Sequence, residues 1–144
     1  MARGPRRAAS VSHSVILIDT SAWVEFLRDT GSGVCARVDE LLDEDMAICD
    51  AIRMEVLAGA RDEMHLRALR RLLARAMTLP TVPDDYDHAA LLYRSCRSGG
   101  ETVRKLIDCL IAAVALRAGT PVLHADADFD VLARHSRLET AGLA

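Results

Sequence analysis

The sequence predicts an α/β domain with a mostly parallel central sheet. Residues 15–18 (VILI) are apolar and rich in β-branched side chains, without the alternation of a half-exposed strand, which is typical of a strand buried on both faces. Further along, short apolar runs alternate with helical patterns, and this alternation favours a parallel sheet covered by helices on both faces. The 144 residues fit one domain, which would bury roughly 68–70% of its unfolded surface.

The first half of the chain is predicted to contain two strands and four helices. The first strand leads into a helix with Trp23, Phe26 and Leu27 on one face. Thr20 or Ser21 can cap this helix, because a hydroxyl at that place accepts a hydrogen bond from a free backbone N–H. The other elements of this half are a helix at 33–42, a strand at 46–48, a helix capped by Asp50 that stops near Gly59, and a helix at 62–77.

The helix at 62–77 is strongly amphipathic, with an apolar stripe opposed by arginines that face solvent or a protein partner. The stripe comprises Leu66, Leu69, Leu72, Leu73 and Met77, and the arginines are Arg67, Arg70, Arg71 and Arg75. The second half of the chain then offers a brief strand at 78–79, a helix at 84–97 that stops at 98–100, a long helix capped by Thr102 and ending near Gly119, a strand at 121–123, and a closing helix at 129–134.

Charge does not select a function class for this chain. Its net charge is −3, and if four of the 21 acids bind a metal, 17 remain against 18 basic residues. A polyanionic substrate is therefore neither supported nor excluded. The four cysteines form no C-x-x-C pair, which favours free thiols in a reducing compartment.

The start of the chain does not resemble a secretion signal. An arginine-rich stretch precedes the apolar run VILI, which is too short for the apolar core of a signal peptide. We therefore expect a cytoplasmic protein without a membrane span. Residues 1–13 are expected to form a flexible extension ahead of a domain at 14–144.

Four carboxylates stand where folding alone does not explain them. Asp108 interrupts the apolar helix KLIDCLIAAVAL, and a buried carboxylate is costly unless it is paired or bound to a metal. A lysine is an unpromising partner, because Lys105 is the only one in the chain. The other acids are Asp19 at the end of VILID, Glu55 in IRMEVLAG, and Asp126 after TPVLHA.

These acids are expected to converge on one edge of the sheet. Asp19 and Asp126 each follow a predicted strand, and Glu55 and Asp108 fall in the first two turns of helices, within about 9 Å of that edge. Packed together they would repel each other, and Mg²⁺ or Mn²⁺, which favours carboxylate and water oxygens, removes the conflict. Such a site suits hydrolysis of phosphodiester bonds, because the metal polarises the phosphate and activates water.

Asp128 is an alternative to Asp126 as the fourth acid. We place the site acid at Asp126, with Asp128 as a helix cap or as support behind the ligands. Asp126, Asp128 and Asp130 imitate the opening of a calcium loop, but Val131 stands where glycine is needed and Arg137 where the bidentate glutamate should be.

The segments that carry the four acids resemble a PIN domain, in particular the toxin ribonuclease of VapBC-type toxin–antitoxin pairs. The resemblance spans residues 15–140 and is carried by VILIDTSAWVEFL, MEVLAGA, IDCLIAAVAL and TPVLHADADFDVLA in series. It implies a three-layer α/β/α fold, a Mg²⁺- or Mn²⁺-dependent endoribonuclease, a homodimer and a cognate antitoxin. The family's acids fall on Asp19, Glu55, Asp108 and Asp126. Its small polar position falls on Thr20 or Ser21, and we expect these two residues to touch substrate.

Basic residues near the predicted edge are candidates for RNA contacts. Arg97 and Arg104, with their neighbours Arg94 and Lys105, flank Gly99 and Gly100, and can either meet RNA phosphates or form a solvated face. His124 is expected to be structural rather than to contact substrate.

Two other functions stay open. One is a DNA-directed metal nuclease, because metal chemistry on the phosphate does not require the 2′-hydroxyl. The other is a catalytically weak module of this fold that binds RNA or an antitoxin.

Overall fold

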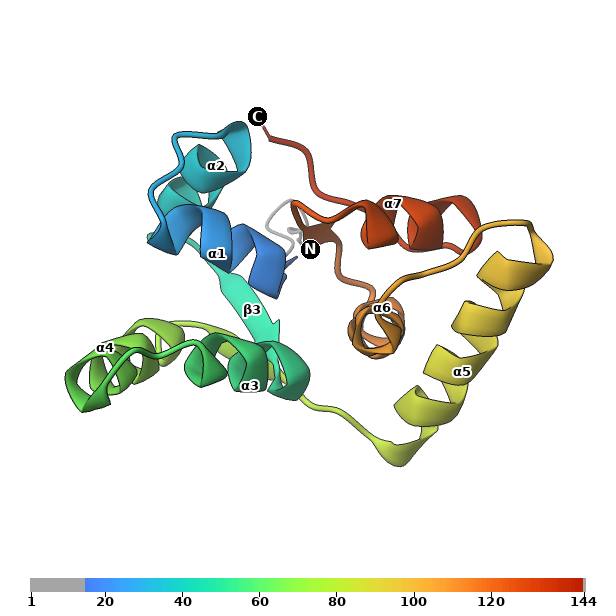
Figure 1. Ribbon diagram of the computed structural model, residues 1–144, viewed down its shortest axis with the longest axis horizontal. Helices are drawn as coiled ribbons and strands as arrows, with labels where there is room; N and C mark the ends of the chain where they lie inside the picture. The colour runs from blue at the N-terminus through green and yellow to red at the C-terminus, as the bar shows by residue number, and fades with distance from the viewer. Residues whose placement is uncertain (1–14, 144) are drawn as a thin grey trace, which may run out of the picture.

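The computed structural model describes residues 15–143, and the predicted extension at 1–13 lies outside this range. Within it, the chain forms seven helices and four strands (Figure 1). Their bounds are β2 Ile16–Ile18, α1 Thr20–Leu27, α2 Gly33–Leu41, β3 Met46–Cys49, α3 Asp50–Ala58, α4 Glu63–Leu73, β4 Met77–Leu79, α5 Pro83–Ser98, α6 Leu106–Ala118, β5 Val122–Leu123 and α7 Ala127–Arg134.

The four strands form one parallel sheet in the order β4-β3-β2-β5. Leu17 of the inner strand β2 pairs with Ala47 of β3 on one side and with Val122 of β5 on the other. Helices cover both faces, so the predicted three-layer α/β/α fold is confirmed. Since all strands run the same way, the carboxyl ends of β3, β2 and β5 lie side by side on one edge.

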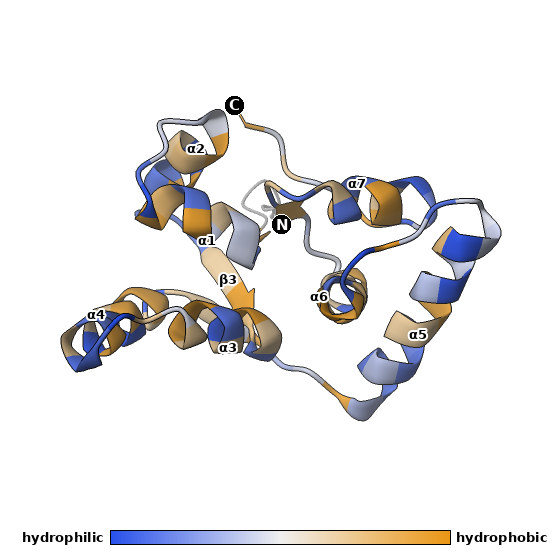
Figure 2. Cartoon of the chain, viewed as in Figure 1, coloured by the Kyte–Doolittle hydropathy of each residue, from blue (hydrophilic) through white to orange (hydrophobic). Residues whose placement is uncertain are grey.

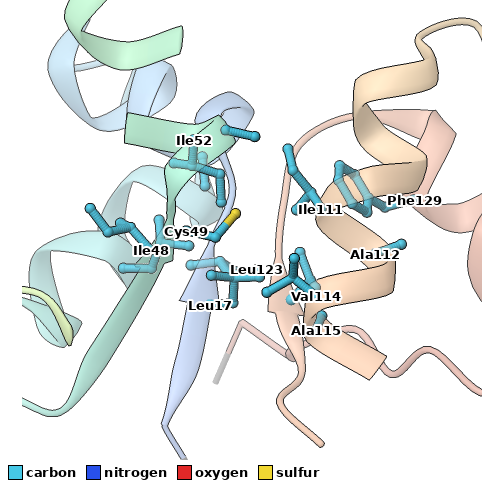
Figure 3. Packing of buried hydrophobic residues seen from close by; sticks show 14 of the residues in the cluster. Leu17, Ile48, Cys49, Ile52, Ile111, Ala112, Val114, Ala115, Leu123 and Phe129 are labelled. Carbon is cyan, nitrogen blue, oxygen red and sulfur yellow. The ribbon is translucent and has the colours of Figure 1, made fainter. Parts of the chain in front are cut away.

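Helix α6 forms the centre of the apolar core. Its residues from Ile111 to Ala115 are all buried, and it packs against α5, α7 and α3, seen end-on in Figure 1. Colouring by hydropathy shows it mostly apolar, in contrast to the two-sided α4 (Figure 2). In the core, Ile111 and Val114 face Leu17 and Leu123 of the sheet (Figure 3). A helix that is apolar on nearly all sides is stable only when it is enclosed in this way.

Several helix starts differ from the sequence prediction. Helix α1 is capped by Asp19, whose side chain accepts the N–H of Ser21, and not by Thr20 or Ser21. Helix α3 starts at Asp50 itself, after Cys49.

Helix α6 starts three residues later than the predicted cap at Thr102 implies, because the preceding segment is bound elsewhere. The backbone N–H groups of Arg104 and Lys105 donate to the side chain of Asp128, 3.0 Å away in each case. Lys105 therefore occupies the cap position in an extended conformation. The predicted end is correct, since Gly119 closes the helix with a φ of 66°, a value that favours glycine.

Helix α4 is shorter than predicted. Leu69 and Leu73 are buried as expected, but the helix ends at Leu73, and Met77 lies in β4 with 52% of its surface exposed. The cause is sheet pairing, since Met77 is the parallel partner of Ala47 and cannot also continue the helix. The predicted arginine face is exposed.

An ion pair between a buried carboxylate and a partly exposed arginine joins α5 to α6, and the sequence patterns did not predict it. Asp85, only 2% exposed, accepts two hydrogen bonds of 3.0 Å from Arg117 and one of 2.9 Å from the N–H of Val82. The guanidinium of Arg117 also reaches the carbonyl of Pro80. The hydrogen bond from Arg117 is the main reason why the pKa of Asp85 is lowered, with burial opposing it.

Cys35, Cys49, Cys96 and Cys109 are free and buried. In residues 15–143, none of the helices combines the length and the apolar character needed to span a bilayer.

Candidate metal centre

Three of the proposed acids occupy the predicted edge of the sheet. Asp19 directly follows β2, Asp108 lies in the first turn of α6, and Asp126 lies between β5 and α7. Carboxylate oxygens of Asp108, Asp126 and Asp128 lie within 4.8 Å of one another, a spacing at which they can share one metal ion. We call Asp108, Asp126 and Asp128 the acidic cluster.

Asp19 has one occupied and one free oxygen. Its Oδ2 accepts the backbone N–H of Ser21 at 2.9 Å and the Ser21 hydroxyl at 2.6 Å, whereas its Oδ1 is buried and has no hydrogen-bond partner. Burial, partly offset by Ser21, raises the pKa of this carboxyl. The Ser21 Oγ in turn accepts the N–H of Ala125 at 2.9 Å, which ties α1 to the loop that carries Asp126. Ser21 therefore positions Asp19 against this loop.

Asp108 is the most perturbed acid of the site. It is 2% exposed, and its pKa is raised to about 8, first by burial, then by its interaction with Asp128 and by the negative charge of Asp19. Its Oδ2 is buried without a hydrogen-bond partner. At neutral pH such a carboxyl holds a proton unless a cation stabilises the charge.

Asp126 combines helix capping with a position in the cluster. Its Oδ1 accepts the N–H of Asp128 at 2.9 Å, which makes it the cap of α7, and also an N–H of the Arg104 guanidinium at 2.6 Å. Its Oδ2 lies 2.9 Å from Nζ of Lys105. Burial disfavours the charge of Asp126, but the N–H of Asp128 and the cations of Lys105 and Arg104 outweigh it and lower the pKa.

Asp128 is tied to the backbone in front of α6. Its Oδ1 accepts the N–H of Arg104 at 3.0 Å and Nε–H of the same residue at 3.2 Å, and its Oδ2 accepts the N–H of Lys105 at 3.0 Å. Burial opposes its charge, yet these donors and Asp108 lower its pKa. The expectation that Asp128 caps the closing helix is wrong, because Asp126 does so, whereas support behind the ligands matches its contacts.

We expect Asp128→Ala to lower the free energy of unfolding by about 1–3 kcal/mol, because it strips two backbone N–H groups of their acceptor. Urea denaturation without metal measures the change. Asp130→Ala, on the exposed side of the same helix, is the matched control and should change stability by less than about 0.5 kcal/mol. Equal effects of the two substitutions would contradict this structural role of Asp128.

Glu55 stands beside Asp19 rather than in the acidic cluster. Its Oε1 accepts the hydroxyl of Thr20 at 2.7 Å, and its charge contributes to the raised pKa of Asp19. The side chain is half-buried, on the second turn of α3. Thr20 and Ser21, which were predicted to touch substrate, thus each hold a site carboxylate in place.

The basic candidates have different surroundings. Arg104 binds Asp126 and Asp128, whereas Arg97 lies on α5 with its guanidinium 5.5 Å from the centre of the Tyr93 ring. His124 accepts the N–H of Asp126 at 3.2 Å, a contact that fits a structural histidine.

The sequence argument against a lysine partner for Asp108 was wrong. Nζ of Lys105 lies 3.9 Å from Oδ2 of Asp108. A spacing of three residues at the start of a helix brings two such side chains together, and this spacing was the available signal.

The donor set fits a hard divalent cation. Two buried carboxylate oxygens, Oδ1 of Asp19 and Oδ2 of Asp108, lack a hydrogen-bond partner. Carboxylate oxygens are the ligands that Mg²⁺ and Mn²⁺ prefer, and Mg²⁺ needs only one or two of them when water and phosphate complete its shell. A cation bound to either oxygen would satisfy it and stabilise the charged form of that carboxyl, against the burial that raises its pKa.

Comparison with known proteins places this geometry in a family. Residues 16–135 match the model of the PIN domain. The chain is 48% identical over 132 residues to ribonuclease VapC11 of Mycobacterium tuberculosis. This alignment covers 88% of this chain and 98% of that protein.

Two solved structures illustrate the similarity of fold. VapBC-5, a member of the VapBC family of toxin–antitoxin systems from M. tuberculosis, has a TM-score of 0.61 at 27% identity, covering 88% of this chain and 97% of that chain. DNA-bound VapBC from Salmonella typhimurium has a TM-score of 0.72 at 18% identity, covering 91% and 99%. With its parallel sheet and its carboxylates on one edge, the chain belongs to the PIN domain family.

Proposed function

We propose that this chain is a Mg²⁺- or Mn²⁺-dependent endoribonuclease. The observation that carries the proposal is the pair of orphaned carboxylate oxygens on Asp19 and Asp108 beside the acidic cluster, since both are buried and neither has a hydrogen-bond partner. The name of the 48% identical relative, a ribonuclease, supports RNA as the substrate. Between the two ions, Mg²⁺ and Mn²⁺, the carboxylate set does not discriminate.

The side chains divide the work between binding the ion and placing water. Asp19 and Asp108 are the main ligands, and Asp126 and Glu55 act directly or through bound water. A divalent ion bound there supplies Lewis-acid polarisation of the phosphate and a more acidic water. Thr20 fixes one oxygen of Glu55, so that this carboxylate would be held in place to orient the attacking water. Ser21 holds Asp19 at a fixed distance from the Asp126 loop.

We further propose that the nuclease is the toxin of a toxin–antitoxin pair. VapBC-5, which has a similar fold, belongs to a family of toxin–antitoxin systems. The 48% identical relative, VapC11, is a ribonuclease whose name places it with the VapBC systems. On this basis the chain would work as a homodimer in the cytoplasm, and a cognate antitoxin would bind and inhibit it. Arg97 remains a candidate for binding RNA phosphates.

The test is cleavage of RNA and of DNA of the same sequence by antitoxin-free protein, with Mg²⁺, with Mn²⁺ and with EDTA. We expect RNA cleavage in both metals and none in EDTA. Asp19→Asn should reduce cleavage by about 100-fold or more, while the fold persists because asparagine caps a helix as well as aspartate does. The exposed Asp130→Asn on α7 is the matched control and should retain activity.

The alternative outcomes are distinct. Cleavage in EDTA, or full activity of Asp19→Asn, would refute the metal mechanism. Equal cleavage of RNA and DNA would identify a general metal nuclease. Binding of RNA without cleavage in every metal would favour the binding module.

A further inference from the structure

Lys105, the only lysine of the chain, lies beside the acidic cluster. Its Nζ lies 2.9 Å from Oδ2 of Asp126 and 3.9 Å from Oδ2 of Asp108, the oxygen that has no hydrogen-bond partner. The proximity of Asp19 also stabilises the ammonium and contributes to its raised pKa, which is caused first by Asp126. One ammonium group therefore lies close to two carboxyl groups of the acidic cluster, Asp126 and Asp108.

The backbone of Lys105 is held independently of its side chain. Its N–H donates to Asp128, and it precedes α6 as the cap residue without a capping hydrogen bond from the side chain. The side chain itself is half exposed, at 50%. A substitution that removes the ammonium therefore leaves the backbone contacts of α6 in place.

Arg104 does not duplicate this contact. Its guanidinium binds Oδ1 of Asp126 and Oδ1 of Asp128, the oxygens that also accept backbone N–H groups. Lys105 approaches Oδ2 of Asp126 and Oδ2 of Asp108 instead. The ammonium is thus the cation that shares carboxylate oxygens with the proposed metal ligands.

We propose that Lys105 is a built-in counter-cation of this site, which holds the acidic cluster together without metal and competes with the divalent ion for its carboxylates. A bound ion must either displace the ammonium, which breaks the ion pair with Asp126, or coexist with it at the cost of repulsion. Both routes lower the affinity for the metal. Lys105 thereby acts as a positioning residue that sets how much divalent ion the nuclease needs, an inference that rests on the proposed metal site.

The test is Mn²⁺ binding, measured by calorimetry and by loss of the free-ion electron paramagnetic resonance signal, in wild type and in Lys105→Met. Methionine keeps an unbranched apolar stem without charge. We expect Mn²⁺ to bind Lys105→Met about tenfold more tightly. In EDTA the same variant should melt about 2–4 °C lower, because the cluster has lost its counter-ion, and Mn²⁺ should raise its Tm by more than it raises that of wild type.

Two controls separate this effect from a general change of charge. Lys105→Arg keeps a cation at the cluster and should stay within a fewfold of the wild-type affinity. Arg71→Met removes a positive charge from the exposed face of α4 and should not alter Mn²⁺ binding. If Lys105→Met does not fold, Lys105→Gln replaces it.

Each outcome decides one of the two proposals. Equal or weaker Mn²⁺ binding by a folded Lys105→Met would overturn the counter-cation role and leave the metal site standing. Absence of Mn²⁺ binding by wild type would overturn the metal site, and the role of Lys105 with it.

Discussion

Replacing Asp108 by asparagine is expected to reduce metal-dependent RNA cleavage by about a thousandfold. Removal of a residue that only supports a metal ligand already costs roughly 10–100-fold, and Asp108 is proposed to bind the ion directly. Asparagine keeps the shape of the side chain, which is 2% exposed in the first turn of α6. The loss should therefore come from the missing charge rather than from a changed fold.

The same variant should alter how stability depends on pH in the absence of metal. The pKa of Asp108 is about 8 in the folded protein against 3.8 for a free side chain. Between these values the folded state binds more protons than the unfolded state, so the free energy of unfolding falls as pH rises, by at most about 1.4 kcal/mol per pH unit. Asp108→Asn removes this contribution and should flatten the slope between pH 5 and 8.

The measurements are RNA cleavage in Mn²⁺ and urea denaturation in EDTA at pH 5 and pH 8. Asp87→Asn, an exposed acid on α5, serves as control for both. Cleavage within tenfold of wild type would remove Asp108 from the metal site. If the free energy of unfolding depends on pH in the same way in Asp108→Asn and in wild type, the charge of Asp108 is already stabilised in the metal-free protein. Lys105, whose ammonium lies 3.9 Å from Asp108, would then be the first residue to test.

Replacing Arg117 by methionine is expected to destabilise the domain by about 1–3 kcal/mol, because the buried carboxylate of Asp85 loses its main hydrogen-bond partner. Both carboxylate oxygens of Asp85 bind this guanidinium, and the carboxylate is only 2% exposed. Without Arg117, the buried carboxylate of Asp85 keeps only one of these hydrogen bonds, the one from the N–H of Val82. The anchor between the start of α5 and the end of α6 would be lost with it.

Acid titration gives an independent measure of this pair. The folded pKa of Asp85 is lowered, chiefly by its hydrogen bond from Arg117, so its contribution to stability is present above its unfolded value of 3.8 and is lost as pH falls through the lowered folded pKa. Arg117→Met should therefore shift acid unfolding to higher pH. The double variant with Asp85→Asn should recover part of the loss, because no unpaired charge remains. A loss below about 1 kcal/mol in Arg117→Met would mean that solvent, rather than Arg117, stabilises Asp85.

Much of the fold could be predicted because its signals are local. The unbroken apolar run at β2, the amphipathic pattern of α4 and the apolar helix α6 each follow from neighbouring residues, and so does Gly119 as a helix end. Asp108 was recognisable for the same reason, since a carboxylate among Ile, Leu, Val and Ala side chains needs a partner.

The features that were missed depend on contacts between distant segments. The late start of α6 requires Asp128, more than 20 residues further along, to bind the backbone of Arg104. The early end of α4 requires β3 as a pairing partner for Met77. Similarly, Asp85 and Arg117 are 32 positions apart, and no periodic pattern links them. The resemblance to PIN domains suggested which acids could bind an ion, but not the hydrogen bonds by which Thr20 and Ser21 hold Glu55 and Asp19.

The link between Ser21 and Ala125 spans 104 positions and has a consequence for the protein while it is being made. On a ribosome, β2, β3 and β4 are synthesised long before β5 pairs with β2, and Asp126 comes later still. Early segments can collapse and form helices, but the last carboxylate reaches the others only when nearly the whole domain has left the exit tunnel. A nascent chain thus has no complete acidic cluster, and the proposed RNA cleavage requires nearly the whole domain to have left the ribosome.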